Sequence, residues 1–157
     1  MTDRSVLHAT FAVSRLYPAA PARVFQAFAD PAIKRRWFIE ADGWTIDEYT
    51  VDFAEGGRER SRFRFGDGPP MASDAVYHEI VPDRRIVYSY AMTVEGKRIS
   101  VSLATIAIAA DGTGTRLVYT EQAAFLDGAD VPANRETGWR ELLDMLALEL
   151  DRQTAAA

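Results

Sequence analysis

A long helix is predicted at the end of the chain, over 132–153, because its apolar residues recur at helical spacing. Charged residues occupy the opposite arc of the same segment. At about 1.5 Å per residue such a helix is roughly 30 Å long, the diameter of a small domain. The apolar stripe of this helix requires an equally long surface to pack against. The stripe consists of Trp139, Leu142, Leu143, Leu146 and Leu150.

Upstream of this helix, polar and apolar residues alternate with the period of two that is typical of strands. The clearest alternation runs from Arg58 to Phe65, where every second residue is an arginine. We expect the arginine row to form a solvated sheet face, with a patch for an acidic partner as the alternative. Gly, Pro and Asp mark turns between the runs, and strands are expected over 8–17, 44–53, 58–65, 73–81, 84–92, 97–108 and 115–125.

Two short helices are predicted between the first two strands. Pro21 stands where the first turn of a helix tolerates proline, and apolar residues follow it at helical spacing. Asp30 and Pro31 end this helix and precede a second, shorter one. We expect that helix to direct Trp37 inward and to leave Lys34, together with the two arginines after it, in solvent.

These elements indicate an α+β fold in which one curved antiparallel sheet of about seven strands wraps around the long helix. The chain is long enough for one domain over 1–157, and we expect an ordered core over about 8–153. A strongly curved sheet does not close tightly on a helix along its whole length. The pattern therefore favours an internal cavity. The inward parity of the strand over 97–108 is ambiguous, since neither phase is cleanly apolar.

Composition narrows the classes of function. The chain is 48% apolar and 26% charged, which is ordinary for a globular protein, and its net charge of −5 argues against nucleic acid as a partner. It has no cysteine, and its N-terminus lacks the apolar core of a signal peptide. Its candidate apolar segments are interrupted by charge, so no membrane span is expected. A cytoplasmic location fits these features. His8 and His78 have no companion at ligand spacing, so we expect no metal site. We expect no cofactor either.

The more apolar parity of each strand predicts a cavity rich in aromatic residues. Several of these residues are tyrosines, whose hydroxyls need partners when buried, and a plain core rarely contains so many. Apolar walls with a few convergent polar groups are typical of a small-molecule site, although close packing of a core is the alternative. The candidate ligand-binding residues are Trp37, Phe53, Phe63, Phe65, Tyr77, Tyr88, Tyr90, Met92, Tyr119, Glu121, Arg135 and Trp139.

Two glutamates are candidates for catalysis. The same parity directs Glu121 and Glu79 inward, where an unpaired carboxylate costs several kcal/mol. Either one can be a general acid or base with a raised pKa. The alternative, which we favour, is that they pair with arginines or tyrosine hydroxyls. Arg135 and Glu136, one turn before Trp139, are expected to flank the cavity mouth or to cap the start of the helix.

The order of the elements and a series of short motifs resemble the SRPBCC superfamily with its START-like, or helix-grip, fold. Within it, the chain is similar to bacterial single-domain relatives of the activator of heat-shock-protein-90 ATPase family. Ala54 departs from the family pattern, which often has arginine there. The matching motifs are Ala20–Phe25, Asp30-Pro31, Trp37, Asp52-Phe53 before Gly56-Gly57, Tyr77–Pro82, Arg85-Ile86, Thr115–Leu117, Thr120–Gln122, Gly138-Trp139 and Leu142-Leu143.

The resemblance implies the fold more firmly than an activity, because members of the superfamily carry hydrophobic ligands, cyclise polyketides or assist chaperones. Three functions follow as hypotheses. The first is binding of a small hydrophobic or aromatic molecule. The second is a cyclase-like or hydrolase-like enzyme that uses Glu121 or Glu79 with a tyrosine. The third is a chaperone-associated protein. In addition, Leu148 falls on the polar arc of the last helix, and we expect it to mark a homodimer contact.

Overall fold

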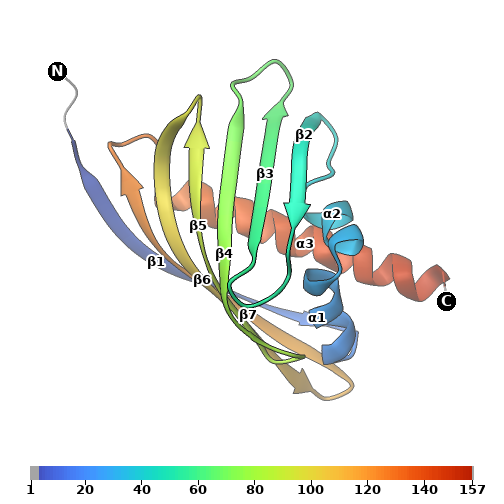
Figure 1. Ribbon diagram of the computed structural model, residues 1–157. Helices are drawn as coiled ribbons and strands as arrows, with labels where there is room; N and C mark the ends of the chain where they lie inside the picture. Colours follow the sequence, from blue (N-terminus) through green and yellow to red (C-terminus); the bar gives the residue numbers. More distant parts are fainter. Residues whose placement is uncertain (1–3, 157) are drawn as a thin grey trace.

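The chain forms a curved sheet, with a long helix along its inner side and two short helices at one end (Figure 1). The computed structural model describes residues 4–156. Its elements follow in the order β1 (Val6–Tyr17), α1 (Pro21–Ala29), α2 (Pro31–Phe38), β2 (Trp44–Val51), β3 (Arg58–Phe65), β4 (Met71–Val81), β5 (Arg85–Val94), β6 (Lys97–Asp111), β7 (Gly114–Leu126) and α3 (Pro132–Ala156).

The sheet has seven strands in the order β1-β7-β6-β5-β4-β3-β2, and every neighbouring pair is antiparallel. Consecutive strands from β2 to β7 are neighbours, which is the meander predicted from the short turns. β1 joins at the far edge, beside β7. The α+β helix-grip fold is therefore confirmed.

The break between the two short helices has a specific chemical cause. Asp30 accepts hydrogen bonds from the backbone amides of Ala32 at 2.9 Å and Ile33 at 3.3 Å, so it caps the first turn of α2. Pro31 follows at the position where a missing N–H costs nothing. Trp37 of α2 is buried, and its indole N–H donates to the carbonyl of Ala27 in α1 at 2.9 Å. This bond holds the two helices together.

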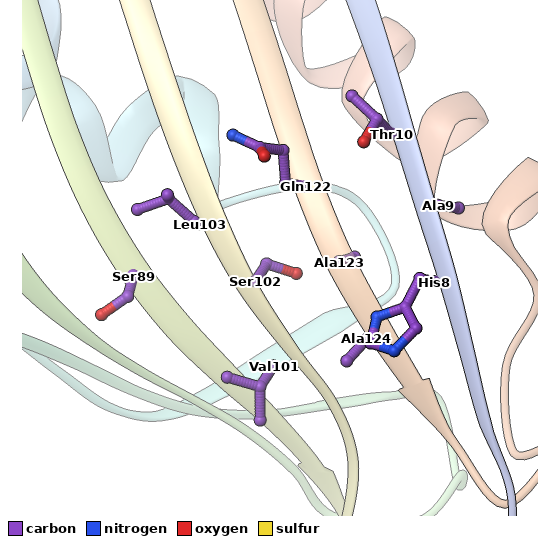
Figure 2. A pocket seen from close by; sticks show the side chains of 10 residues that line it. All are labelled: His8, Ala9, Thr10, Ser89, Val101, Ser102, Leu103, Gln122, Ala123 and Ala124. Carbon is purple, nitrogen blue, oxygen red and sulfur yellow. The ribbon is translucent and has the colours of Figure 1, made fainter.

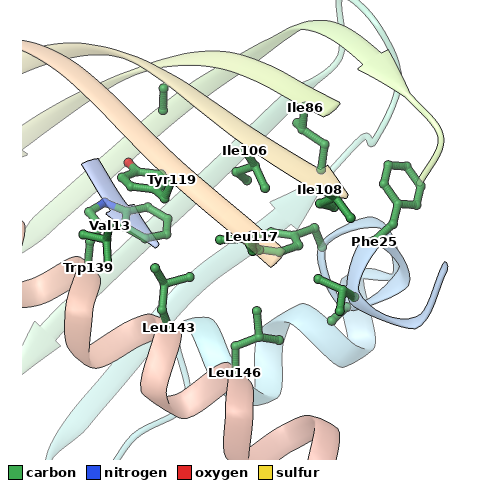
Figure 3. Packing of buried hydrophobic residues seen from close by; sticks show 14 of the residues in the cluster. Val13, Phe25, Ile86, Ile106, Ile108, Leu117, Tyr119, Trp139, Leu143 and Leu146 are labelled. Carbon is green, nitrogen blue, oxygen red and sulfur yellow. The ribbon is translucent and has the colours of Figure 1, made fainter. Parts of the chain in front are cut away.

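The solid part of the core lies between α3 and the strands near β1 (Figure 3). Leu143, Leu146 and Leu150 of α3 are at most 2% exposed, and each contributes about 1.5–3 kcal/mol by burial. Tyr17 ends β1, and its hydroxyl donates to the backbone carbonyl of Leu143 at 2.8 Å. Figure 3 shows Trp139, Leu143 and Leu146 directed from the helix toward the sheet.

Two of the three register shifts in the sheet affect which side chains of β4 and β6 face inward. The register shifts between Tyr77 and Glu79, so His78 has no counterpart on β5 and the parity of β4 reverses after it. A second shift, between Met92 and Thr93, leaves Ile99 of β6 without a counterpart on β5. After this shift, every second residue of β6 faces inward, which settles the parity that the sequence left ambiguous. The inward-facing, buried residues are Ser100, Ser102, Ala104, Ile106 and Ile108.

Candidate functional site

A pocket of about 770 Å³ opens between α2, the first turns of α3 and the strands β3 to β5. It exists because the wall opposite the helix carries small side chains: Ser61 pairs with Ser73 across β3 and β4, and Ala75 follows two residues later. Most of the other lining side chains are aromatic or apolar. The residues of the predicted cavity that line it are Trp37, Phe63, Tyr77, Tyr88, Tyr90, Met92, Arg135 and Trp139.

Four residues expected in the cavity wall lie elsewhere. Tyr119 and Glu121 are completely buried behind the wall. Phe53 packs between Phe25 and Tyr77, with ring centroids 5.8 Å and 4.9 Å away. Phe65 has the strand parity of Phe63 and packs on Trp44, with ring centroids 5.1 Å apart, but it is 56% exposed, so the expectation that it lines the cavity is wrong. The pairing of β3 with β4 ends at Phe63, and Phe65 projects past the edge of the covered sheet.

Glu121 is the acceptor at the centre of one buried polar cluster. Its Oε1 accepts hydrogen bonds from the hydroxyls of Tyr90, at 2.7 Å, and Tyr119. Its Oε2 accepts from Ser102 at 2.7 Å and forms an ion pair with Arg135 at 3.1 Å. Both carboxylate oxygens are thus satisfied twice. The arrangement agrees with the expectation that Glu121 pairs with arginine and tyrosines.

Arg135 brings this cluster to the pocket surface. Its side chain is 9% exposed, and it donates to the Tyr90 hydroxyl at 3.0 Å and to Ser100 at 2.7 Å. Asp130 lies 3.5 Å from the same guanidinium group. The neighbouring Glu136 instead pairs with Arg140 on the exposed side of α3, at 2.8 Å, so only the arginine of the predicted pair lines the pocket.

The pocket tyrosines remain neutral hydrogen-bonding groups. Burial is the main cause that raises the pKa of Tyr77, Tyr88 and Tyr90 far above the ordinary value, and neighbouring carboxylates raise each pKa further. Arg135 and the Trp139 indole N–H act in the opposite direction on the pKa of Tyr90, but they do not outweigh burial. The pocket therefore presents phenol groups to its contents.

A second polar cluster, which the sequence analysis missed, lies at the α2 side of the pocket. Lys34 was expected in solvent but is 6% exposed, and its ammonium group pairs with Glu59 at 2.7 Å. The hydroxyl of Tyr77 donates to the same glutamate at 2.5 Å. Lys34 also lies over the ring of Phe38, 4.5 Å from the centroid. All four residues line the pocket.

The sequence carried a signal for both missed residues. Lys34 precedes Trp37 and Phe38 by three and four positions, which places the three on neighbouring parts of one helix face. Glu59 lies on the same face of β3 as Ser61, and the arginine row lies on the other face. The arginines are exposed or half-buried, as expected. A charged residue on an apolar face is the pattern that marks both positions.

Glu79, the other catalytic candidate, lies outside the pocket. Its side chain is 43% exposed and pairs with Arg85. The expectation that it faces inward with Tyr77 is wrong, because the extra residue His78 turns it to the outer face of the sheet.

A second hollow, of about 440 Å³, lies on the sheet face opposite α3 (Figure 2). Thr10, Leu103 and Gln122 project into it from three neighbouring strands, and Leu103 is 41% exposed. The titratable side chain in its lining is His8. In contrast to the pocket under α3, the lining of this hollow contains no Asp, Glu, Lys or Arg side chain.

Two further observations concern residues 4–156. This part of the chain contains no group of three or more His, Asp or Glu side chains arranged to hold a metal ion. Within the same range, no helix has the length and apolar character needed to cross a bilayer.

Solved structures of several bacterial proteins are similar to this one. A protein from Rhizobium leguminosarum is 44% identical over 96% of this chain and 99% of that chain, with a TM-score of 0.92. A protein from Rhizobium loti is 50% identical over 92% and 99% of the two chains, with a TM-score of 0.87. A protein from Chromobacterium violaceum is 27% identical over 88% and 94%, with a TM-score of 0.74.

No curated protein matches the chain. The family model described as Activator of Hsp90 ATPase homolog 1-like protein matches residues 18–151. That range begins just before α1 and ends within α3, so it includes every element of the pocket. The chain therefore belongs to the Activator of Hsp90 ATPase homolog 1-like family.

Proposed function

We propose that this protein binds a small apolar or aromatic molecule in the pocket between α3 and the sheet. The observation that carries the proposal is the pocket itself, about 770 Å³ in volume and walled mainly by aromatic and apolar side chains. Ligand sites in proteins fall in the range of about 300–1,000 Å³. The space is far larger than the small packing defects of an ordinary core.

The polar groups of the pocket also support binding. Tyr90 and Arg135 hold one side, and Lys34 with Glu59 holds another, so hydrogen-bonding groups converge from two directions. A few fixed polar groups in an apolar wall orient a ligand without requiring it to be charged. The aromatic side chains of Trp139 and Tyr88 line the pocket, and aromatic side chains pack favourably against planar molecules.

The enzymatic alternative has less support. Glu121 has four donors on its two oxygens, so it has little capacity left to take a proton from a substrate. Glu79 lies at the surface with Arg85. An acid–base role for either residue requires contact with a ligand, and neither lines the pocket.

Native mass spectrometry of gently purified protein tests the proposal, with binding of the fluorescent dye 8-anilinonaphthalene-1-sulfonate as a second readout. Ala75→Phe fills the pocket from β4. Ala91→Phe is the matched control, because Ala91 pairs with Val101 across the outer face of β5 and β6. We expect the Ala75 variant alone to lose a bound mass and the dye. Equal binding by both variants and the wild type would contradict the proposal.

Chaperone association is a second candidate function, and the match to an Hsp90-activator family model favours it. It does not require the pocket. A pull-down with a bacterial Hsp90 separates the two functions: capture that is unchanged by Ala75→Phe supports chaperone association, whereas no capture at micromolar concentration excludes it.

A further inference from the structure

The two buried carboxylates of the site differ in what their oxygens contact. Glu59 is 6% exposed and accepts from Lys34, at 2.7 Å, and from the Tyr77 hydroxyl, and both bonds end on Oε1. Within residues 4–156 its Oε2 accepts no hydrogen bond, whereas both oxygens of Glu121 are occupied. Glu59 thus keeps one carboxylate oxygen available for another donor.

This oxygen is open to the pocket. Across the described range, the Tyr49 hydroxyl is the one side-chain polar atom that is both sealed from solvent and without a hydrogen-bond partner. Oε2 of Glu59 also lacks a partner but does not belong to this class, so it is accessible to solvent. Glu59 lines the pocket, so that is where this oxygen is reached. Because this oxygen lies at the pocket surface, a donor supplied by a ligand can take the place of water there.

Lys34 supplies the complementary group beside it. An ammonium group has three N–H donors, and the contacts of Lys34 use two: Glu59 at 2.7 Å and the Tyr77 oxygen at 3.4 Å. One N–H is left on a side chain that is 7% exposed and lines the pocket. A free acceptor and a free donor therefore lie on adjacent side chains.

We propose that Lys34 and Glu59 form a subsite for a hydroxyl group, phenolic or alcoholic, on the apolar ligand of this pocket. The inference rests on the proposed binding function and specifies the class of ligand. The ligand hydroxyl donates to Oε2 of Glu59 and accepts from the ammonium group of Lys34. Its apolar body lies toward Tyr88, Tyr90 and Met92, which line the same pocket.

A hydroxyl fits this pair better than a charged group does. A ligand carboxylate is repelled by the free oxygen of Glu59, and a ligand ammonium is repelled by Lys34. A hydroxyl is neutral and both donates and accepts one hydrogen bond. Its bonds here are to charged groups, which are the stronger class.

Two probes of the same ring system test the subsite: 2-naphthol, which carries a hydroxyl, and 2-methoxynaphthalene, which has no donor hydrogen. Isothermal titration calorimetry compares their affinities. We expect the wild type to prefer 2-naphthol by about tenfold or more. Lys34→Met combined with Glu59→Gln removes both charges at similar volume and keeps an acceptor for Tyr77, and we expect the preference to fall to about twofold or less.

Glu79→Gln is the control, because it makes the same change at an exposed glutamate outside the pocket and leaves Glu59 untouched; its preference should equal that of the wild type. If the double variant does not fold, Glu59→Gln alone is expected to reduce the preference. Equal affinity of the wild type for both probes, or a preference that survives these variants, would overturn the subsite alone. If neither probe binds the wild type, the binding function is overturned as well.

Discussion

Tyr119 of β7 and Trp139 of α3 stack face to face, with ring centroids 3.8 Å apart and ring planes 19° from parallel. Tyr119 is completely buried in the solid core, whereas Trp139 also lines the pocket. The indole N–H of Trp139 reaches the Tyr90 hydroxyl at 3.5 Å. This stack is therefore the boundary at which close packing of α3 on the sheet ends and the pocket begins.

Truncation of Trp139 is expected to be strongly destabilising. Trp139→Ala removes the stack and enlarges the pocket into the core, and we expect a loss of about 3–5 kcal/mol in the free energy of unfolding. Chemical denaturation followed by circular dichroism measures it. Trp44→Ala is the control, because Trp44 is 38% exposed, and its loss should be clearly smaller. Similar losses for the two variants would contradict the assigned boundary.

The two catalytic candidates are expected to differ in their effect on stability. Glu121→Gln leaves the guanidinium of Arg135, 9% exposed, without its closest carboxylate, and we expect a loss of about 3 kcal/mol or more. Glu79→Gln breaks an exposed pair and should cost less than about 1 kcal/mol. Thermal unfolding of both variants gives the comparison. A larger loss for Glu79→Gln would show that the outward orientation of this residue is incorrect.

We expect the protein to unfold at alkaline pH because its tyrosines are buried. Burial is the main cause that raises the pKa of all six tyrosines in the chain. The native state therefore keeps them protonated above pH 10, where the unfolded chain ionises. Stability is fully present below pH 10 and falls above it by roughly 1.4 kcal/mol per pH unit for each tyrosine.

We expect absorbance at 295 nm, which reports tyrosinate, and circular dichroism to change together in one cooperative step as the pH is raised. The result that opposes this prediction is ionisation of several tyrosines near pH 10 while the circular dichroism stays native.

An acid transition is expected from Glu149 of α3. Hydrogen bonds from Arg36 are the main cause that lowers the pKa of this carboxyl, and Gln153 adds to the effect. A lowered pKa in the folded state means that the pair stabilises above the unfolded pKa, about 4.3, and that this contribution disappears as the pH falls through the folded value.

The stability difference between wild type and Glu149→Gln should therefore be largest near pH 6 and shrink below about pH 4. Denaturation midpoints between pH 3 and pH 7 measure it. Arg36→Gln should flatten the profile in the same way, because Arg36 is the main cause of the lowered pKa. A constant difference over the whole range would be inconsistent with this assignment.

The exposed side chain of Leu148 is the basis of a prediction about the oligomeric state. It is 55% exposed on α3, and we expect a homodimer contact at this position. Multi-angle light scattering at micromolar concentration should give a dimer mass for the wild type and a monomer mass for Leu148→Lys. A monomer mass for the wild type would remove this interpretation.

Local patterns were sufficient to predict the elements of this fold. The alternation from Arg58 to Phe65 and the turn residues around it indicate β3 without knowledge of its neighbours. Asp30 and Pro31 likewise mark the break between α1 and α2, because capping and the missing proline N–H act within one turn. The short turns between consecutive strands also predicted the meander from β2 to β7.

Tertiary structure decided which of the predicted side chains reach the site. Glu79 turns outward because His78 adds one residue to β4, and such an extra residue reverses every inward position after it. Phe65 is exposed because the pairing of β3 with β4 ends two residues earlier.

Lys34 shows the same limit for a helix. The amphipathic pattern of α2 indicates one inward face, centred on Trp37. Because α2 also borders the pocket, the side of the helix that carries Lys34 is buried as well, where Glu59 of β3 provides its counter-charge. The sequence determines which residues share a face, whereas the packing of distant elements decides which faces are buried, because the partner atoms come from other parts of the chain.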